Sequence, residues 1–221
     1  MQYSTFAAID IGSYDVILEI FEISKKQGIR SVDKICHRME LGKDTYTLGK
    51  IRPEMEEELC RVLADFVRIM EGYRVDAYRA MASSAISEAA NSLYVLGKIR
   101  QLTGLSVTVL SNSEQRFLGY KALAAMEDNF NKIIEKGTAI LDLDGGSFQI
   151  SLFDKDALVT TQNIRMGSLR IRERLAGIQS ETEHYEEMVE ELIWNEVSSF
   201  KKMYLKDRKI ENIMLIGDVF T

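Results

Sequence analysis

The sequence predicts an α/β protein built from two similar halves, and three observations support this prediction. Strand-like runs at residues 6–11 and 138–143 each lead into an acidic turn that contains glycine. Each turn is followed by two further strand-like runs, and helices alternate with strands between the two regions. The same supersecondary pattern therefore opens both halves, although the halves share little sequence.

The elements of the first half follow from periodicity and from their end signals. The expected strands cover residues 6–11, 16–23, 31–40, 77–82 and 107–110. The clearest helix begins at Pro53 and ends before Gly72, because its apolar residues fall on one face and glutamates fill its first turns. Further helices are expected at residues 84–102 and 113–126, and residues 42–50 are expected to form a loop.

The second half repeats the opening pattern after the polar segment 128–136. Its expected strands cover residues 138–143, 148–153, 158–163 and 213–216, and a long amphipathic helix is expected at residues 181–204. We therefore place one domain at residues 1–126 and a second, shorter domain at residues 127–221. If two such halves packed face to face, both glycine turns would point into one cleft.

Composition and charge exclude several classes of function. The net charge of −6 argues against a nucleic-acid surface or an anionic membrane as partner. Cys36 and Cys60 form no CxxC pair, so a disulfide framework or zinc site has little support. Neither a signal peptide nor an apolar run long enough to span a bilayer is apparent. We expect a cytoplasmic protein.

The two glycine turns are suited to binding phosphate. A glycine without a Cβ lets backbone N–H groups approach an anion, and the serine that ends each turn, Ser13 or Ser147, adds a hydroxyl donor. An aspartate at the end of the preceding strand can hold magnesium through water or orient a nucleophilic water. Phosphoryl transfer to water needs mainly such positioning and charge neutralisation.

An ordered set of motifs along the chain is similar to that of a known family. The set comprises Asp10-Ile11-Gly12-Ser13, Met39-Glu40-Leu41-Gly42 with Leu48-Gly49, Ala82-Ser83-Ser84-Ala85 with Glu88-Ala89 and Asn91, Ser111 to Gln115, Asp142 to Ser147, and Met166-Gly167-Ser168-Leu169-Arg170. The chain resembles the Ppx/GppA family of exopolyphosphatases and guanosine pentaphosphate phosphohydrolases, a branch of the actin-like ATPase superfamily. Almost the whole chain takes part in the resemblance.

The resemblance implies a fold and a chemistry. The implied fold is ribonuclease H-like (actin-like ATPase), with two similar βββαβα-type subdomains around a cleft and the second one incomplete. In such enzymes, water attacks the terminal phosphoryl group of inorganic polyphosphate or guanosine pentaphosphate, with Mg2+ assisting. The expected partners are therefore these phosphate compounds, whereas nucleic acid and membrane are not expected.

The resemblance also assigns roles to individual residues. Catalytic roles fall to Gln115, Glu114 and Asp10, phosphate binding to Gly12, Ser13, Ser87, Asp142, Asp144, Gly145, Gly146 and Ser147, and metal binding to Asp10 and Asp142.

Several of these positions depart from the family pattern. Gln115 stands where the family has its catalytic glutamate, and an amide cannot accept a proton at neutral pH. Ser87 replaces a phosphate-binding arginine, and Asp144 replaces the first glycine of the second turn. Gln149 and Tyr14 replace a glutamate and an asparagine of the family.

These departures leave alternative hypotheses. Under the first, the chain is an active phosphoanhydride hydrolase of reduced or altered specificity. Under the second, it is a catalytically inactive relative that binds a phosphorylated ligand or a protein. An actin-like or sugar-kinase-like ATPase is a third alternative, whose adenosine-side glycine motif would lie beyond residue 221. The chain is short for the family, either naturally or by truncation, and apolar surface left exposed in the second half would favour a homodimer.

Overall fold

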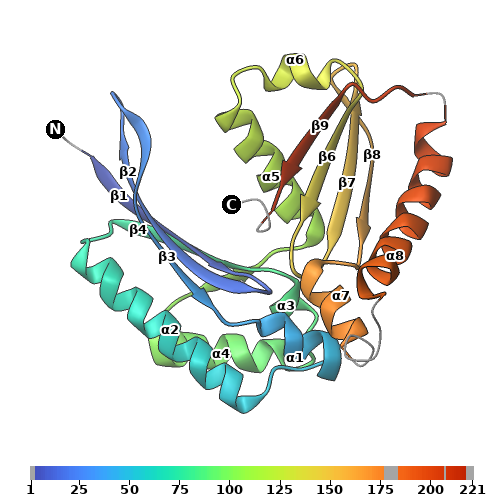
Figure 1. The fold of residues 1–221 in the computed structure, drawn as a ribbon. Helices are drawn as coiled ribbons and strands as arrows, with labels where there is room; N and C mark the ends of the chain where they lie inside the picture. Colours follow the sequence, from blue (N-terminus) through green and yellow to red (C-terminus); the bar gives the residue numbers. More distant parts are fainter. Residues whose placement is uncertain (1–2, 177–183, 207, 218–221) are drawn as a thin grey trace. The chain divides into compact units, whose positions relative to one another are not determined.

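The computed structural model describes residues 3–176, 184–206 and 208–217, and the chain divides into two compact units. The first unit covers Met1–Ser113 and the second covers Glu114–Thr221. Each unit has its own mixed sheet and its own helices (Figure 1). The predicted division follows residue 126, whereas the observed division assigns most of helix α5 (Asn112–Met126) to the second unit.

The first unit is built on a five-stranded sheet in the order β3-β2-β1-β4-β5. Its strands are β1 (Ser4–Ile11), β2 (Asp15–Ser24), β3 (Gly28–Arg38), β4 (Ala77–Ala82) and β5 (Val107–Val109). The first three strands are antiparallel, whereas β4 runs parallel to β1 and β5 runs parallel to β4. The predicted strands are thus all present in this unit.

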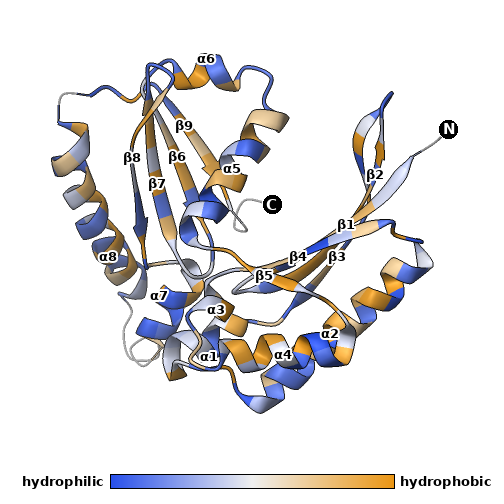
Figure 2. Cartoon of the chain, turned by 180° about the vertical axis from the view of Figure 1, so that it is seen from behind, coloured by the Kyte–Doolittle hydropathy of each residue, from blue (hydrophilic) through white to orange (hydrophobic). Residues whose placement is uncertain are grey.

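Helices α2 (Pro53–Gly72) and α4 (Ser92–Thr103) pack against each other and supply much of the first core. Figure 2 shows hydrophobic and hydrophilic residues mixed along α2, as expected for a helix with one buried face. Its buried apolar side chains include Leu59, Leu63 and Phe66, which join apolar residues of β1 and β2 in one cluster. This core fixes the strand ends that carry the first glycine turn.

The prediction of a loop at residues 42–50 was wrong, because helix α1 (Leu41–Leu48) lies there. The helix ends at Gly49 in the left-handed region, with φ 71°, where the N–H of Gly49 donates to Thr45 O. The helix has few apolar residues, and its buried Asp44 is satisfied by the N–H and guanidinium of Arg52. Apolar periodicity therefore gave no signal for this helix.

The single helix predicted at residues 84–102 is in fact two helices, α3 (Ser84–Ser87) and α4. The chain between them is held by the side chain of Asn91, which bonds both the N–H and the C=O of Ile51 at 3.0 and 2.8 Å. The same amide donates to Glu56 at 2.8 Å. A tertiary contact therefore replaces the helical hydrogen bonds at this point.

The second unit is built on a four-stranded sheet in the order β8-β7-β6-β9. Its strands are β6 (Thr138–Leu143), β7 (Phe148–Asp154), β8 (Ala157–Ile164) and β9 (Asn212–Ile216). Again the first three strands are antiparallel and the last one runs parallel to the first. The two sheets therefore share the arrangement β3-β2-β1-β4 and β8-β7-β6-β9, which confirms the predicted internal similarity.

Helices cover both faces of the second sheet (Figure 1). They are α5, α6 (Phe130–Ile134), α8 (Tyr185–Phe200) and the short π-helical segment η1 (Lys201–Leu205), whereas α7 (Ser168–Leu175) lies at the ends of the strands. Phe200 packs with the cluster around Ile150, whereas Tyr120 packs with the cluster around Phe153. The long helix predicted at residues 181–204 begins at Tyr185 among the described residues, and residues 181–183 lie outside them.

Across residues 3–176, 184–206 and 208–217, the helices are too short or too polar to cross a membrane.

Candidate functional site

The first glycine turn joins β1 to β2 and is closed by its own backbone. The N–H of Gly12 donates to Asp15 O at 3.0 Å, and a Cβ on Gly12 would lie only 2.9 Å from that oxygen. Ser13 follows with 4 % of its surface exposed. Its carbonyl accepts the N–H of Gly42 at 2.8 Å, which ties the start of α1 to the turn. The turn is thus held by α1 as well as by its own hairpin.

Three hydroxyl groups meet at the first turn. Tyr46 on α1 places its phenol oxygen 2.6 Å from Ser13 Oγ and 2.8 Å from Ser84 Oγ. The two serine oxygens are 3.2 Å apart. The cluster joins the first turn, α1 and α3. Tyr46 lies more than thirty residues from either serine in the sequence. Tyr46 is not among the predicted site residues, because it lies in the segment that was predicted as a loop.

The other predicted residues of the first unit surround this turn. Asp10 is exposed and stands on β1 opposite Ile17 of β2 and Met81 of β4. Ser87 is exposed at the end of α3, and its N–H donates to Ser83 O at 3.1 Å. Ser87 therefore presents a short neutral side chain where the family pattern has a guanidinium.

The second glycine turn contains a hydrogen-bonded carboxylate. Asp144 Oδ1 accepts the backbone N–H groups of both Gly146 and Ser147, each at 2.6 Å. Its other oxygen, Oδ2, lies 3.5 Å from the hydroxyl of Ser147, and the turn closes through Asp144 N–H to Ser147 O at 3.1 Å. Backbone N–H groups of a glycine turn are the donors expected to hold a phosphate oxygen. Here the chain's own carboxylate accepts them.

Helix α7 supports the second turn. The N–H groups of Ser168 and Arg170 donate to Asp144 O and Gly145 O, both at 3.1 Å, and Arg170 Nε donates to Gly146 O at 2.9 Å. Gly167 fits between these groups because it has no side chain. A Cβ at Gly167 would lie 2.4 Å from both Asp144 O and Ser147 N. The Met-Gly-Ser segment of the sequence thus acts as a rigid base for the turn.

Helix α5 brings Gln115 to the same turn. Its anchors to the sheet are Tyr120, whose hydroxyl donates to Ser151 Oγ at 2.6 Å, and Arg116, which donates to Thr161 Oγ1 at 3.2 Å. From this position Gln115 Nε2 donates to Asp144 Oδ2 at 3.4 Å.

Two predicted residues beside these anchors have different surroundings. Glu114 is exposed, whereas Gln115 is half-buried. Asp142 is half-buried on β6, opposite the buried Gln149 of β7. The second unit therefore brings together Gln115 and the whole of the turn from Asp142 to Ser147.

The pKa of the Asp144 carboxyl is raised from its ordinary value, chiefly by burial. The hydrogen bonds from Ser147, Gly146 and Gln115 act in the opposite direction and lower the pKa, but they do not cancel the effect of burial. Burial thus favours the protonated form of Asp144, whereas the hydrogen bonds favour the carboxylate.

Metal-binding capacity is limited in the described part of the chain. Those residues contain no group of three or more His, Cys, Asp or Glu side chains close enough to hold a metal ion. Each unit does place one aspartate, Asp10 or Asp142, on the strand that leads into its glycine turn.

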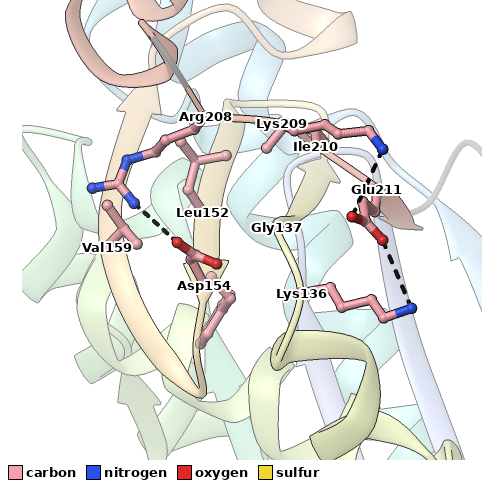
Figure 3. A pocket seen from close by; sticks show the side chains of 10 residues that line it. Lys136, Gly137, Leu152, Asp154, Val159, Arg208, Lys209, Ile210 and Glu211 are labelled. Atoms are coloured by element: carbon pink, nitrogen blue, oxygen red, sulfur yellow. Dashed lines mark hydrogen bonds and ion pairs between the residues drawn. The ribbon is translucent and has the colours of Figure 1, made fainter.

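A small cavity of about 330 Å³ lies at the other end of the second sheet, where β6 begins (Figure 3). Its charged side chains are already paired: Arg208 with Asp154 at 3.2 Å, and both Lys136 and Lys209 with Glu211 at 3.7 and 3.8 Å. The predicted site residues do not line this cavity. It is separate from the candidate site.

Comparisons with known proteins agree with the motifs. Residues 19–221 match the family model described as the Ppx/GppA phosphatase family. Exopolyphosphatase 1 of Mycobacterium leprae is 26 % identical over 144 residues, which are 65 % of this chain and 41 % of that protein. The bifunctional 3-dehydroquinate synthase/phosphatase of Fusobacterium nucleatum is 22 % identical over 174 residues, 76 % of this chain and 26 % of that protein. The chain thus spans well under half the length of either relative.

A solved structure of the Aquifex aeolicus member of the Ppx/GppA protein family has the same fold, with a TM-score of 0.73 and 23 % identity. The match covers 100 % of this chain and 68 % of that one. The predicted α/β fold of the actin-like ATPase type is thereby confirmed. Because the family model matches nearly the whole chain, this protein belongs to the Ppx/GppA phosphatase family.

Proposed function

We propose that this protein binds inorganic polyphosphate or a guanosine pentaphosphate-type nucleotide, and that it hydrolyses the terminal phosphoanhydride bond very slowly or not at all. Family membership supports the class of ligand, since the matched relatives include exopolyphosphatases. The low activity is our inference from two side chains, Asp144 and Gln115.

The observation that carries the proposal is the pair of hydrogen bonds from Gly146 and Ser147 to Asp144 Oδ1. An entering phosphate oxygen would have to displace a tethered carboxylate that already accepts these donors. Hydrogen bonds to charged groups contribute about 1.5–3 kcal/mol each, so this competition weakens phosphate binding at the second turn considerably. The negative charge of Asp144 adds repulsion against a polyanion.

Gln115 supports low activity independently. The family pattern has a glutamate at this position, and loss of a general base costs about a hundredfold to ten-thousandfold in rate. Because the amide of Gln115 donates to Asp144, it is oriented by a carboxylate and offers no basic atom.

Magnesium would assist ligand binding through Asp10 in the first unit or through Asp142 in the second. Mg2+ keeps most of its waters and commonly binds through one or two carboxylates together with substrate phosphates, so the single aspartate beside each turn fits this ion better than a closed protein site would. When bound, the ion supplies charge neutralisation for the phosphate oxygens.

The test is a comparison of wild type, Asp144→Gly and Asp144→Asn with tripolyphosphate and Mg2+, by calorimetric binding and by phosphate release. We expect Asp144→Gly to bind at least tenfold more tightly than wild type, because both N–H groups become available. Asp144→Asn keeps an oxygen acceptor on the turn but loses the charge, and we expect a smaller gain.

Two results would contradict the proposal. Phosphate release by wild type at the rate of an active exopolyphosphatase would show that the chain is an enzyme in its present form. Equal affinity of wild type and Asp144→Gly would show that the carboxylate does not compete for the turn. A parallel titration with guanosine pentaphosphate separates the two ligand classes.

A further inference from the structure

We propose that Tyr46 is a positioning residue for phosphate binding at the first glycine turn, where its phenol directs the hydroxyl proton of Ser13 toward a ligand oxygen. This inference rests on the proposed function. It concerns the first unit, whose turn contains no carboxylate in the place that Asp144 takes in the second unit.

The position of Tyr46 is fixed by two hydrogen bonds from residues that precede it in α1. The N–H of Gly42, at the start of α1, donates to Ser13 O at 2.8 Å. The hydroxyl of Thr45, next to Tyr46, donates to Ala85 O at 2.7 Å in a buried position. Helix α1 is therefore attached to the turn and to α3, the same two segments whose serines contact the phenol. Such anchoring is what a preorganised binding group requires.

Either oxygen can be the donor in each of the three contacts, so the direction of the hydroxyl protons is part of our inference. We assign the proton of Tyr46 to Ser13. Its bond to Ser13, at 2.6 Å, is the shorter one, and a phenol is a stronger donor than an alkyl hydroxyl. The order Ser84 to Tyr46 to Ser13 follows from this assignment.

Ser13 is then the end of the chain of donors. The remaining pair, Ser13 and Ser84, is separated by 3.2 Å and is the weakest of the three. A ligand oxygen would easily compete with this contact for the proton of Ser13. A hydroxyl that accepts a hydrogen bond also becomes a better donor, so Tyr46 strengthens the bond from Ser13 to an oxyanion.

This role compensates in part for a missing charge. Ser87 stands where the family pattern has an arginine, so the first unit lacks that guanidinium for its ligand. Three neutral hydroxyls cannot replace its charge, but they favour an oxygen-rich anion whose oxygens accept from O–H donors.

The test is a double-mutant cycle on the full chain, with tripolyphosphate and Mg2+ as ligand and calorimetry as readout. The variants are Tyr46→Phe, Ser13→Ala and the two combined. We expect each single variant to lower affinity about three- to tenfold, since each loses one hydrogen bond. We expect the combined variant to bind no more weakly than Ser13→Ala, because Tyr46 acts through Ser13.

A matched control removes a phenol hydroxyl elsewhere in the same unit. Tyr73 donates to Asp33 at 2.8 Å on the exposed surface, and Tyr73→Phe should leave affinity unchanged. Urea unfolding of every variant identifies losses that come from a damaged fold.

The outcomes separate this inference from the proposed function. If wild type binds tripolyphosphate and Tyr46→Phe binds equally well, the inference fails and the proposed function stands. If the losses of binding free energy in the two single variants add up in the combined variant, the inference also fails, because Tyr46 then does not act through Ser13. If wild type fails to bind at all, the proposed function and the inference fall together.

Discussion

Gln115 Nε2 lies 3.4 Å from Asp144 Oδ2, so two of the positions that depart from the family pattern are in contact with each other. The amide donates to the carboxylate, and the same carboxylate accepts two backbone N–H groups of the glycine turn. A glutamate at position 115 would instead place two carboxylates against each other. The two replacements are therefore compatible with each other, and reverting Gln115 alone creates a conflict between two carboxylates.

The first prediction concerns restoration of the base. We expect Gln115→Glu alone to leave phosphate release from polyphosphate close to the wild-type rate, because the new carboxylate faces Asp144 and one of the pair will be protonated. We expect Gln115→Glu combined with Asp144→Gly to release phosphate about a hundredfold faster than wild type, in line with the effect of a general base.

The control for this prediction is Lys121→Gln in the combined variant. Lys121 is exposed on the same helix and is not one of the predicted site residues, so its loss should change the rate little. If the increase in rate of the combined variant is no greater than the product of the increases of its two single variants, the two positions act separately.

The second prediction concerns the pH dependence of stability. Burial raises the pKa of Asp144 in the folded protein, so the folded state holds its proton more tightly than the unfolded state does. The stabilisation from this group is complete below the unfolded pKa and is lost as the pH rises through the raised folded pKa. Between these two pKa values, we therefore expect the free energy of unfolding of Asp144→Asn, relative to that of wild type, to increase as the pH rises.

Urea unfolding at a series of pH values from about 4 to 8 measures this difference. Asp128→Asn serves as the control, because Asp128 lies in the same unit and outside the glycine turn. A constant difference between wild type and Asp144→Asn at every pH would refute the expected linkage.

The third prediction compares two glycines. Gly167→Ala should destabilise the protein by several kcal/mol, because its Cβ would collide with backbone atoms of the second turn at 2.4 Å and these atoms have no free space. Gly97 lies inside α4, where an added Cβ would meet nothing within 4 Å, so Gly97→Ala should stabilise by up to about 1 kcal/mol. Thermal or urea unfolding distinguishes the two directions, and equal effects would contradict the close packing at Gly167.

The fourth prediction concerns Asn91, which matches the asparagine of a family motif but bonds protein groups in this structure. Asn91→Ala should destabilise the first unit by about 2–4 kcal/mol, because the backbone of Ile51 and the carboxylate of Glu56 each lose a partner. The exposed Gln101 on α4 provides the control, since Gln101→Ala should change stability by less than about 0.5 kcal/mol. A mild effect at Asn91 would mean that water satisfies these groups.

Much of the fold could be predicted from sequence because its signals are local. The apolar runs of β1, β2, β6 and β7, the acidic first turns of α2, and the glycines after strands and helices each depend on near neighbours. The ordered motifs also led to the family, which the comparison with its model confirmed. These signals identified both glycine turns and two unusual residues, Asp144 in the second turn and Gln115 on α5.

The contacts of those residues were decided by tertiary structure. Helix α1 has no apolar periodicity, since polar groups such as Asp44 are buried against partners distant in sequence, and Tyr46 was therefore missed. The contact of Asp144 with N–H groups two and three residues further on is local. The packing of Gly167 against this turn and the contact of Gln115 with Asp144 join segments distant in sequence, which no local pattern reveals. The sequence by itself determined which residues occupy the turns, whereas the packing of α1, α5 and α7 decided which donors and acceptors those residues meet.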